Sequence, residues 1–203
     1  MSLVQIQGNA SGTGTLTVAA PSTNTNRTLT LPDGTGTFSV AGVNSNIVSG
    51  TVQTAPPTTP QYFDFTSIPS WVKQITVMFS GVSLSGTGNL SVLIGPVAGV
   101  ESTGYASMSS SLLGSTIATT SSTSSFLLSA NNAAAATYQG SIVLTNLSGN
   151  IWTAQGVLAR ATDFGYGYAV GGSKTLAGTL SIVRITGNGT DTFDAGSINI
   201  LYE

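Results

Sequence analysis

Residues 74–82 read QITVMFSGV, and this stretch decides the fold class of the chain. Ile75, Val77 and Phe79 occupy alternate positions, so their side chains share one face of an extended strand. β-Branched and aromatic residues are enriched in strands because they pack well on a pleated surface. The stretch therefore predicts an interior β-strand with one buried face.

Similar short runs recur along the chain, at residues 90–95, 141–147, 152–160, 179–185 and 197–202. In the run at 197–202, Ile198 and Ile200 alternate with Asn199, so both isoleucines are expected to be buried. In the run at 179–185, one face of the strand is formed by Leu180, Ile182 and Arg184. Segments rich in Gly, Ser and Asn separate the runs and predict turns, at residues 85–89, 148–150, 171–173 and 187–189.

Helix signals are nearly absent from the sequence. No stretch of ten or more residues carries the three- and four-residue apolar spacing of a helix, and the alanines at 133–136 predict a loop or a single turn. Many short strands at even spacing instead predict an all-β antiparallel sandwich, jelly-roll-like in type. Trp71 and Trp152 are expected in its core, and the Ser- and Thr-rich residues 109–125 are interpreted as a loop and a weak strand.

A proline-rich segment marks one domain boundary. Residues 55–60 read APPTTP and hold three of the seven prolines, and such segments form semi-rigid spacers. We therefore expect a short β N-terminal anchoring segment at 1–55 and a C-terminal sandwich at 56–203. Short alternating runs at 15–19, 27–31 and 37–40 are too poor in large apolar residues to build a core alone. The N-terminal segment is therefore either disordered or folds against other copies of itself, and its orderly alternation favours the second alternative.

The composition excludes several classes of partner. Only 6% of residues are charged, against about 25% in a typical soluble domain. The five cationic residues are scattered, and nucleic-acid binding needs many Lys and Arg residues close together, so no nucleic-acid partner is expected. No apolar run reaches the roughly 18 residues of a membrane span, so no membrane insertion is expected. The dispersed apolar residues predict a homo-oligomer whose subunit contacts are apolar.

The sequence contains no histidine and no cysteine. This excludes Ser-His-Asp and Cys-His nucleophilic sites as well as ordinary zinc sites. Asp191 and Asp194 are the only acidic residues close together, and they predict a turn into the last strand or, alternatively, a weak Ca²⁺ site. We expect no catalytic residues, no metal and no cofactor. The first residues lack a secretory signal, so synthesis is expected in a host cytoplasm.

An aromatic cluster at residues 163–168, DFGYGY, has two interpretations. In the first, Asp163, Tyr166 and Tyr168 form a receptor-binding loop, because tyrosine offers a large contact area at low entropy cost. In the second, Phe164, Tyr166 and Tyr168 lie on one face of a strand and pack in the core or at a subunit contact. The second interpretation is favoured.

Three stretches carry a resemblance to a known family. Residues 14–37, GTLTVAAPSTNTNRTLTLPDGTGT, are similar to a recurring segment of bacteriophage tail fibres and related virion appendages. Residues 65–77 and 194–203 resemble the C-terminal domain of short phage fibre proteins. The resemblance implies a homotrimer, a virion-anchoring N-terminal part, an outward C-terminal domain and no catalytic residues.

These observations together predict a structural virion protein, a trimeric phage tail fibre involved in host attachment. Its expected partners are its sister chains, another virion protein through the N-terminal segment, and a glycan or protein of the host surface. The alternatives are a capsid-mounted head fibre or decoration protein and a free carbohydrate-binding, lectin-like module. A glycan-degrading spike would need clustered carboxylates and a much longer chain.

Overall fold

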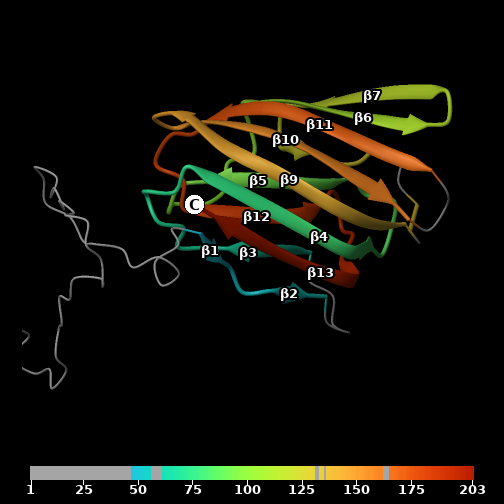
Figure 1. Ribbon diagram of the computed structural model, residues 1–203, viewed down its shortest axis with the longest axis horizontal. Helices are drawn as coiled ribbons and strands as arrows, with labels where there is room; N and C mark the ends of the chain where they lie inside the picture. The colour runs from blue at the N-terminus through green and yellow to red at the C-terminus, as the bar shows by residue number, and fades with distance from the viewer. Residues whose placement is uncertain (1–46, 56–60, 131–132, 135, 162–164) are drawn as a thin grey trace, which may run out of the picture. The chain divides into compact units, whose positions relative to one another are not determined.

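The computed structural model describes residues 47–55, 61–130, 133–134, 136–161 and 165–203, which form strands and turns and contain no helix (Figure 1). The strands are β1 (Val48–Ser49), β2 (Gln53–Thr54), β3 (Tyr62–Phe65), β4 (Gln74–Leu84), β5 (Leu90–Gly95), β6 (Tyr105–Leu113), β7 (Thr116–Ser122), β8 (Phe126–Leu127), β9 (Thr137–Ser148), β10 (Ile151–Arg160), β11 (Tyr166–Thr175), β12 (Ile182–Gly187) and β13 (Phe193–Tyr202).

These strands form two antiparallel sheets that share one core. The larger sheet has nine strands in the order β1-β13-β4-β9-β10-β11-β6-β7, with β2 also paired to β13. The smaller sheet has four strands in the order β3-β12-β5-β8. The arrangement is sandwich-like and all-β, as predicted. The finer expectation of a jelly-roll-like type, which is defined by eight strands in two Greek keys, stays a prediction.

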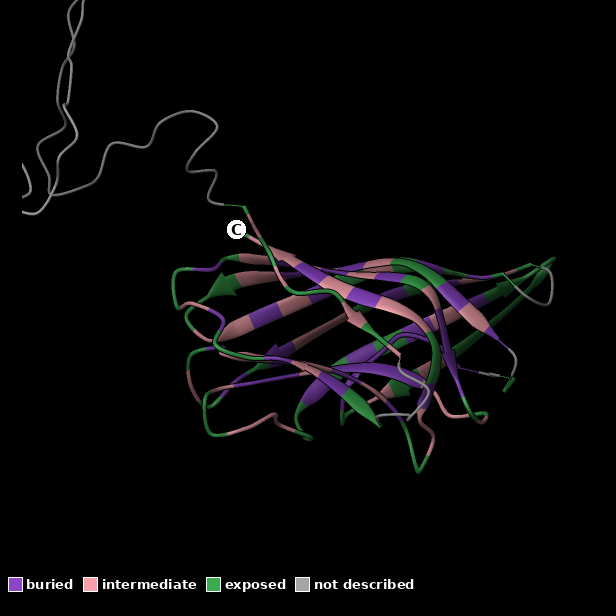
Figure 2. Cartoon of the chain, turned by 90° about the horizontal axis from the view of Figure 1, so that it is seen from below, coloured by how far each residue is buried: buried purple, intermediate pink, exposed green. Residues whose placement is uncertain are grey.

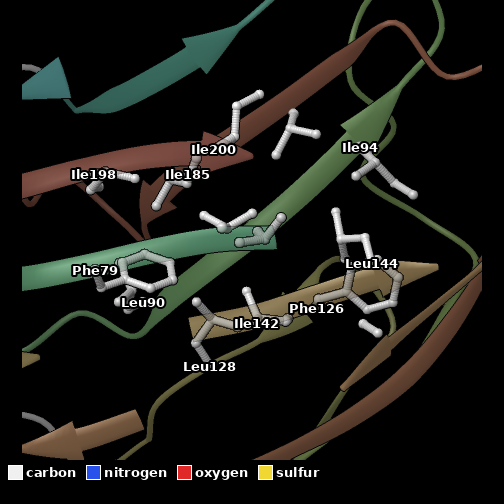
Figure 3. Close-up of a cluster of buried hydrophobic side chains, with 14 of the residues drawn as sticks. Phe79, Leu90, Ile94, Phe126, Leu128, Ile142, Leu144, Ile185, Ile198 and Ile200 are labelled. Carbon is white, nitrogen blue, oxygen red and sulfur yellow. The ribbon is translucent and has the colours of Figure 1, made fainter. Parts of the chain in front are cut away.

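The core lies between the sheets and follows the period-two pattern of the sequence. Ile75, Val77 and Phe79 share the inner face of β4 and are at most 5% exposed, as predicted. Ile198 and Ile200 of β13 are also buried, at 1% and 2% exposed. Figure 2 shows the resulting alternation of buried and exposed residues along the strands. In Figure 3, the side chains of Phe79, Ile198 and Ile200 lie with those of Ile94 and Ile185 from the smaller sheet in one buried cluster.

The six predicted strands are all present, with small shifts at their ends. β4, β9, β10 and β13 extend beyond the predicted runs, whereas β12 begins only at Ile182. In β12, Val183 and Ile185 are fully buried and Arg184 is half-buried, so the core face is the one opposite Arg184. The turn predicted at 85–89 falls between strands as expected, and the turns predicted at 148–150 and 187–189 begin at the last residues of β9 and β12.

The two tryptophans have different surroundings. Trp152 on β10 is 4% exposed and lies in the core, as predicted. Trp71 is 49% exposed, so its predicted core position is wrong. It lies in the turn before β4, where the Val72 N–H donates to the Pro69 carbonyl at 3.1 Å, and not on a strand face. Its ring instead lies 6.0 Å from that of Tyr202.

The Ser- and Thr-rich residues 109–125 contain more structure than the predicted loop and weak strand. They form most of the β6–β7 hairpin, whose register runs without interruption from Ser107 opposite Ser122 to Leu113 opposite Thr116. Ser107, Ser109 and Ser111 occupy the inner face of β6 and are all buried. These hydroxyls form hydrogen bonds with backbone groups, which makes a serine-lined strand compatible with the interior.

The turn predicted at residues 171–173 is also wrong, because these residues lie inside β11. Gly172 stands opposite Ser107 in the pairing of β11 with β6. A Cβ atom at Gly172 would lie 2.7 Å from the carbonyl oxygen of Ala106 and 3.1 Å from the ring of Phe126. The glycine is therefore required because β6 and β8 approach β11 closely at this position. Glycine occurs at such close approaches as well as in turns, so its presence alone does not distinguish the two.

Residues 47–55 run along β13. Val48 pairs with Tyr202, and Ser197 pairs with Thr54, so β1 and β2 add to the edge of the larger sheet. The rest of the predicted anchoring segment, including its runs at 15–19, 27–31 and 37–40, lies outside the described residues, as does the proline-rich segment at 56–60. The boundary there stays a prediction.

Candidate recognition and assembly surfaces

The structure places two of the predicted recognition residues, Tyr166 and Tyr168, at one end of β11. Tyr168 is fully buried, whereas Tyr166 is half-buried, and their rings are stacked with centroids 6.3 Å apart. Asp163 and Phe164 lie outside the described residues. The burial of Tyr168 favours packing over receptor contact for that side chain, while receptor binding by Tyr166 and Asp163 stays a prediction.

Arg160 belongs to the same cluster and is only 7% exposed. Its guanidinium carbon lies 4.0 Å from the centroid of the Tyr166 ring, within the range of a cation–π contact. Burial raises the pKa of the neighbouring Tyr138 well above its ordinary value of 10, and the nearby Tyr168 adds to this effect. Tyr138 is therefore a neutral phenol at any physiological pH, and the cluster is a packed cation–aromatic unit.

A second buried charge lies at the opposite end of β11. Lys174 is 6% exposed and forms an ion pair with Glu101. The Tyr105 hydroxyl accepts a hydrogen bond from the Ile94 N–H at 2.9 Å and donates to the Glu101 carbonyl at 3.0 Å. Burial raises the pKa of Tyr105 to about 12. These groups tie β5 to β6 and β11 and complete a structural network.

The carboxylate of Asp191 is part of a turn. It accepts a hydrogen bond of 2.5 Å from the Gly88 N–H and so holds the β4–β5 turn against the chain entering β13. This is the structural role that the sequence predicted for the region. In the part of the chain that the structure describes, no three acidic, His or Cys residues gather as a metal site would require.

The outer face of the larger sheet carries no charge over six adjacent strands. β4, β9, β10, β11, β6 and β7 contain two charged residues, Arg160 and Lys174, and both are buried. One outward row across these strands consists of Met78, Ser141, Val157, Ala169, Ser110 and Thr119. Val157 is 65% exposed, and Met108 and Leu112 on β6 are 49% and 43% exposed. The face offers uncharged, partly apolar surface to another protein.

The edge of the same sheet is also open. β7 pairs with β6 and with no other strand among the described residues. Its sequence, TIATTSS, holds no charge and no proline, and Ile117 is 67% exposed. Natural proteins usually protect edge strands with charged residues or proline, because an open edge can pair with another chain. β7 is therefore chemically able to accept a further strand.

A groove lies at the end of the larger sheet where β4 begins and β9 ends. Its volume is about 240 Å³. Ten residues line it: Pro69, Ser70, Val72, Lys73, Asn146, Gly149, Asn150, Trp152, Thr179 and Leu180. Sequence reasoning did not single out this groove, because its lining comes from three segments of the chain that are far apart in the sequence.

No family model, curated protein or solved structure matches this chain. Within the described ranges, no helix has the length and hydropathy that crossing a membrane would require.

Proposed function

We propose that this protein is a structural, non-enzymatic component of a bacteriophage particle, a trimeric tail fibre that takes part in host attachment. The observation that carries the proposal is the uncharged outer face of the larger sheet. The similarity of residues 14–37, 65–77 and 194–203 to phage fibre segments supplies the biological context.

The outer face supports self-association on physical grounds. A typical soluble domain carries about 25% charged residues, which keep its surface hydrated, whereas this chain carries 6%. Monomers rarely expose contiguous apolar patches larger than a few hundred Å². A second copy of the chain is the occupant that suits this face, because closed symmetry lets each copy cover the same surface of its neighbour. The choice of three copies comes from the resemblance to phage fibres.

The N-terminal segment is assigned to anchoring within this proposal. Residues 48–54 run along β13 and lengthen the larger sheet, which supports strand pairing as the way in which this part of the chain makes contacts. The segment before them would pair with another virion protein or with sister chains.

The test is the position of the chain in an electron-microscopy map of the intact particle. The proposal expects threefold density for this chain in a tail appendage. Density on the capsid surface would favour the head-fibre or decoration alternative. Absence of the chain from purified particles would contradict both assignments and favour the free lectin-like module.

A further inference from the structure

We infer that the groove beside Lys73 binds an anionic sugar unit. This inference is independent of the fibre proposal, because it concerns the groove of the folded chain and not its place in a particle.

Lys73 differs from the other cationic side chains of the described residues. Lys174 is paired with Glu101, Arg184 forms a bidentate pair with Asp64 at 2.7 and 2.6 Å, and Arg160 is buried against Tyr166. The Lys73 ammonium instead donates to a neutral amide oxygen, Oδ1 of Asn146, at 3.3 Å. It makes no ion pair within the described part of the chain, so its charge remains available to an anion.

The position of Lys73 is fixed by its surroundings. The Asn146 N–H donates to the Lys73 carbonyl at 2.8 Å, which ties the start of β4 to the end of β9. Nδ2 of Asn146 donates to the carbonyl oxygens of Gly149 and Ile151 at 2.9 and 3.2 Å. The amide is therefore held with its oxygen toward Lys73. The backbone of Lys73 and its amide acceptor are therefore fixed, while the exposed Lys73 side chain extends from this strand end with its ammonium at the Asn146 oxygen.

The rest of the lining suits a polyhydroxylated ring. Ser70, Asn150 and Thr179 also line the groove and carry two hydroxyls and one amide. Pro69 is half-buried and offers apolar surface to the C–H face of a ring, whereas Leu180 and Trp152 border the groove with side chains that are 3% and 4% exposed. A few placed polar groups on an apolar surface are the usual composition of a small-molecule site.

The size of the groove limits the ligand. Its volume of about 240 Å³ is below the roughly 300–1,000 Å³ of sites for drug-sized molecules, so it fits one sugar ring and not an oligosaccharide chain. The Lys73 ammonium would bind the anionic group of that ring, and Ser70, Asn150 and Thr179 would bind its hydroxyls. The anionic group is either the carboxylate of a sugar acid or the phosphate of a phosphorylated sugar.

The experiment uses the full chain labelled with ¹⁵N and titrated with N-acetylneuraminic acid, galacturonic acid, glucose 6-phosphate and neutral glucose. We expect an anionic sugar to shift the amide signals of Lys73 and Asn146 and the indole signal of Trp152, with weaker binding at higher salt. A response to the sugar acids assigns a carboxylate, and a response confined to glucose 6-phosphate assigns a phosphate; either supports the inference. Equal binding of neutral glucose, or no shift with any anionic sugar, would overturn it.

Variants locate the binding. Lys73→Ala should weaken binding at least tenfold, and Lys73→Arg should retain most of it, since the charge is kept. Ser70→Ala should weaken binding, whereas Ser115→Ala, at an exposed turn position between β6 and β7, should leave it unchanged. Binding that survives Lys73→Ala in a variant with unchanged thermal unfolding would place the ligand elsewhere and refute the inference. The oligomeric state is measured separately, so a failure here leaves the fibre proposal untouched.

Discussion

The hydroxyl of Ser109 donates a hydrogen bond of 3.0 Å to the carbonyl oxygen of Leu128, 19 residues further along the chain. Both residues are buried, at 1% and 0% exposed. Two residues before Ser109, the Ser107 hydroxyl accepts a hydrogen bond of 3.0 Å from the Leu127 N–H. The serine side chains of β6 therefore form hydrogen bonds with backbone groups of the buried segment around β8. A leucine or valine at these positions would leave those backbone groups without these partners.

We predict that Ser109→Ala destabilises the protein by about 1–3 kcal/mol, because the buried Leu128 carbonyl loses its partner. Ser110→Ala is the matched control, since Ser110 is half-buried on the opposite face of β6; its effect should stay within about 0.5 kcal/mol. Urea unfolding at one fixed protein concentration measures both values. Equal effects of the two substitutions would show that the hydroxyl of Ser109 contributes nothing specific.

Replacing Ile200 with alanine should cost about 2–5 kcal/mol, the range for emptying a packed core site. The side chain is 2% exposed on the inner face of β13. Val97→Ala serves as the control, because Val97 is 86% exposed outside the larger sheet and its truncation removes little buried surface. The same denaturation experiment applies, and a change near zero for Ile200→Ala would show that this face of β13 is not buried in solution.

A charge on the outer face of the larger sheet should disrupt assembly. We expect the unaltered protein to be a trimer that survives about 1 M salt, because apolar contacts are not screened as ion pairs are. Val157→Glu should shift it toward monomer, since burying an unpaired carboxylate is costly. Light scattering coupled to size exclusion gives the mass directly.

Val97→Glu is the control for this experiment, because Val97 is 86% exposed in the connection between β5 and β6 and lies outside that sheet face. It should leave the trimer intact. A monomeric unaltered protein, or a trimer that tolerates Val157→Glu, would refute the assignment of this face to subunit contacts.

The Glu101–Lys174 pair should make stability depend on pH. Burial by itself would raise the pKa of Glu101, but hydrogen bonds from Lys174 and the Ala177 N–H, together with the Lys174 charge, lower it below its ordinary value of 4.5. A carboxylate with a lowered pKa contributes stability above its unfolded-state pKa and loses that contribution as pH falls through its folded-state pKa. The stability of the unaltered protein should therefore fall in acid.

Glu101→Gln removes this titration. The difference in unfolding free energy between the unaltered protein and Glu101→Gln should be constant near neutral pH and should shrink as the pH falls below about 4.5. Denaturation curves for both proteins across this range provide the measurement. A difference that does not change with pH would mean that the pair makes no pH-dependent contribution.

We predict that the purified protein binds host polysaccharide without cleaving it. The Asp191 carboxylate is engaged by the Gly88 N–H, and Asp194 is exposed at the start of β13. Chromatography of polysaccharide after incubation should show no released oligosaccharide. Release that is abolished by Asp191→Asn or Asp194→Asn would demonstrate a hydrolase and contradict the structural assignment.

The sequence alone determined six of the strands and the buried faces of β4 and β13. Alternation is a local property, so Ile75, Val77 and Phe79, and likewise Ile198 and Ile200, revealed the core sides of β4 and β13 without any knowledge of their partners. The low charge and the absence of histidine and cysteine can also be read directly from the sequence. They limit which nucleophilic and zinc sites the chain can form, whatever the arrangement of its strands.

Only the tertiary structure decided how those strands meet. The serines of β6 have the composition of a low-complexity tract, and their partners, Leu127 at the end of β8 and Leu128 directly after it, lie in another part of the chain. In the sequence Gly172 resembles a turn residue. The reason for the glycine is visible only in the structure, because the Ala106 carbonyl that excludes a Cβ atom there belongs to β6. The groove leaves no local pattern because Lys73 and Asn146 are 73 residues apart. Hydrogen bonds and close approaches between distant segments leave no periodic trace in a sequence, so they become visible only when the strands are paired in register.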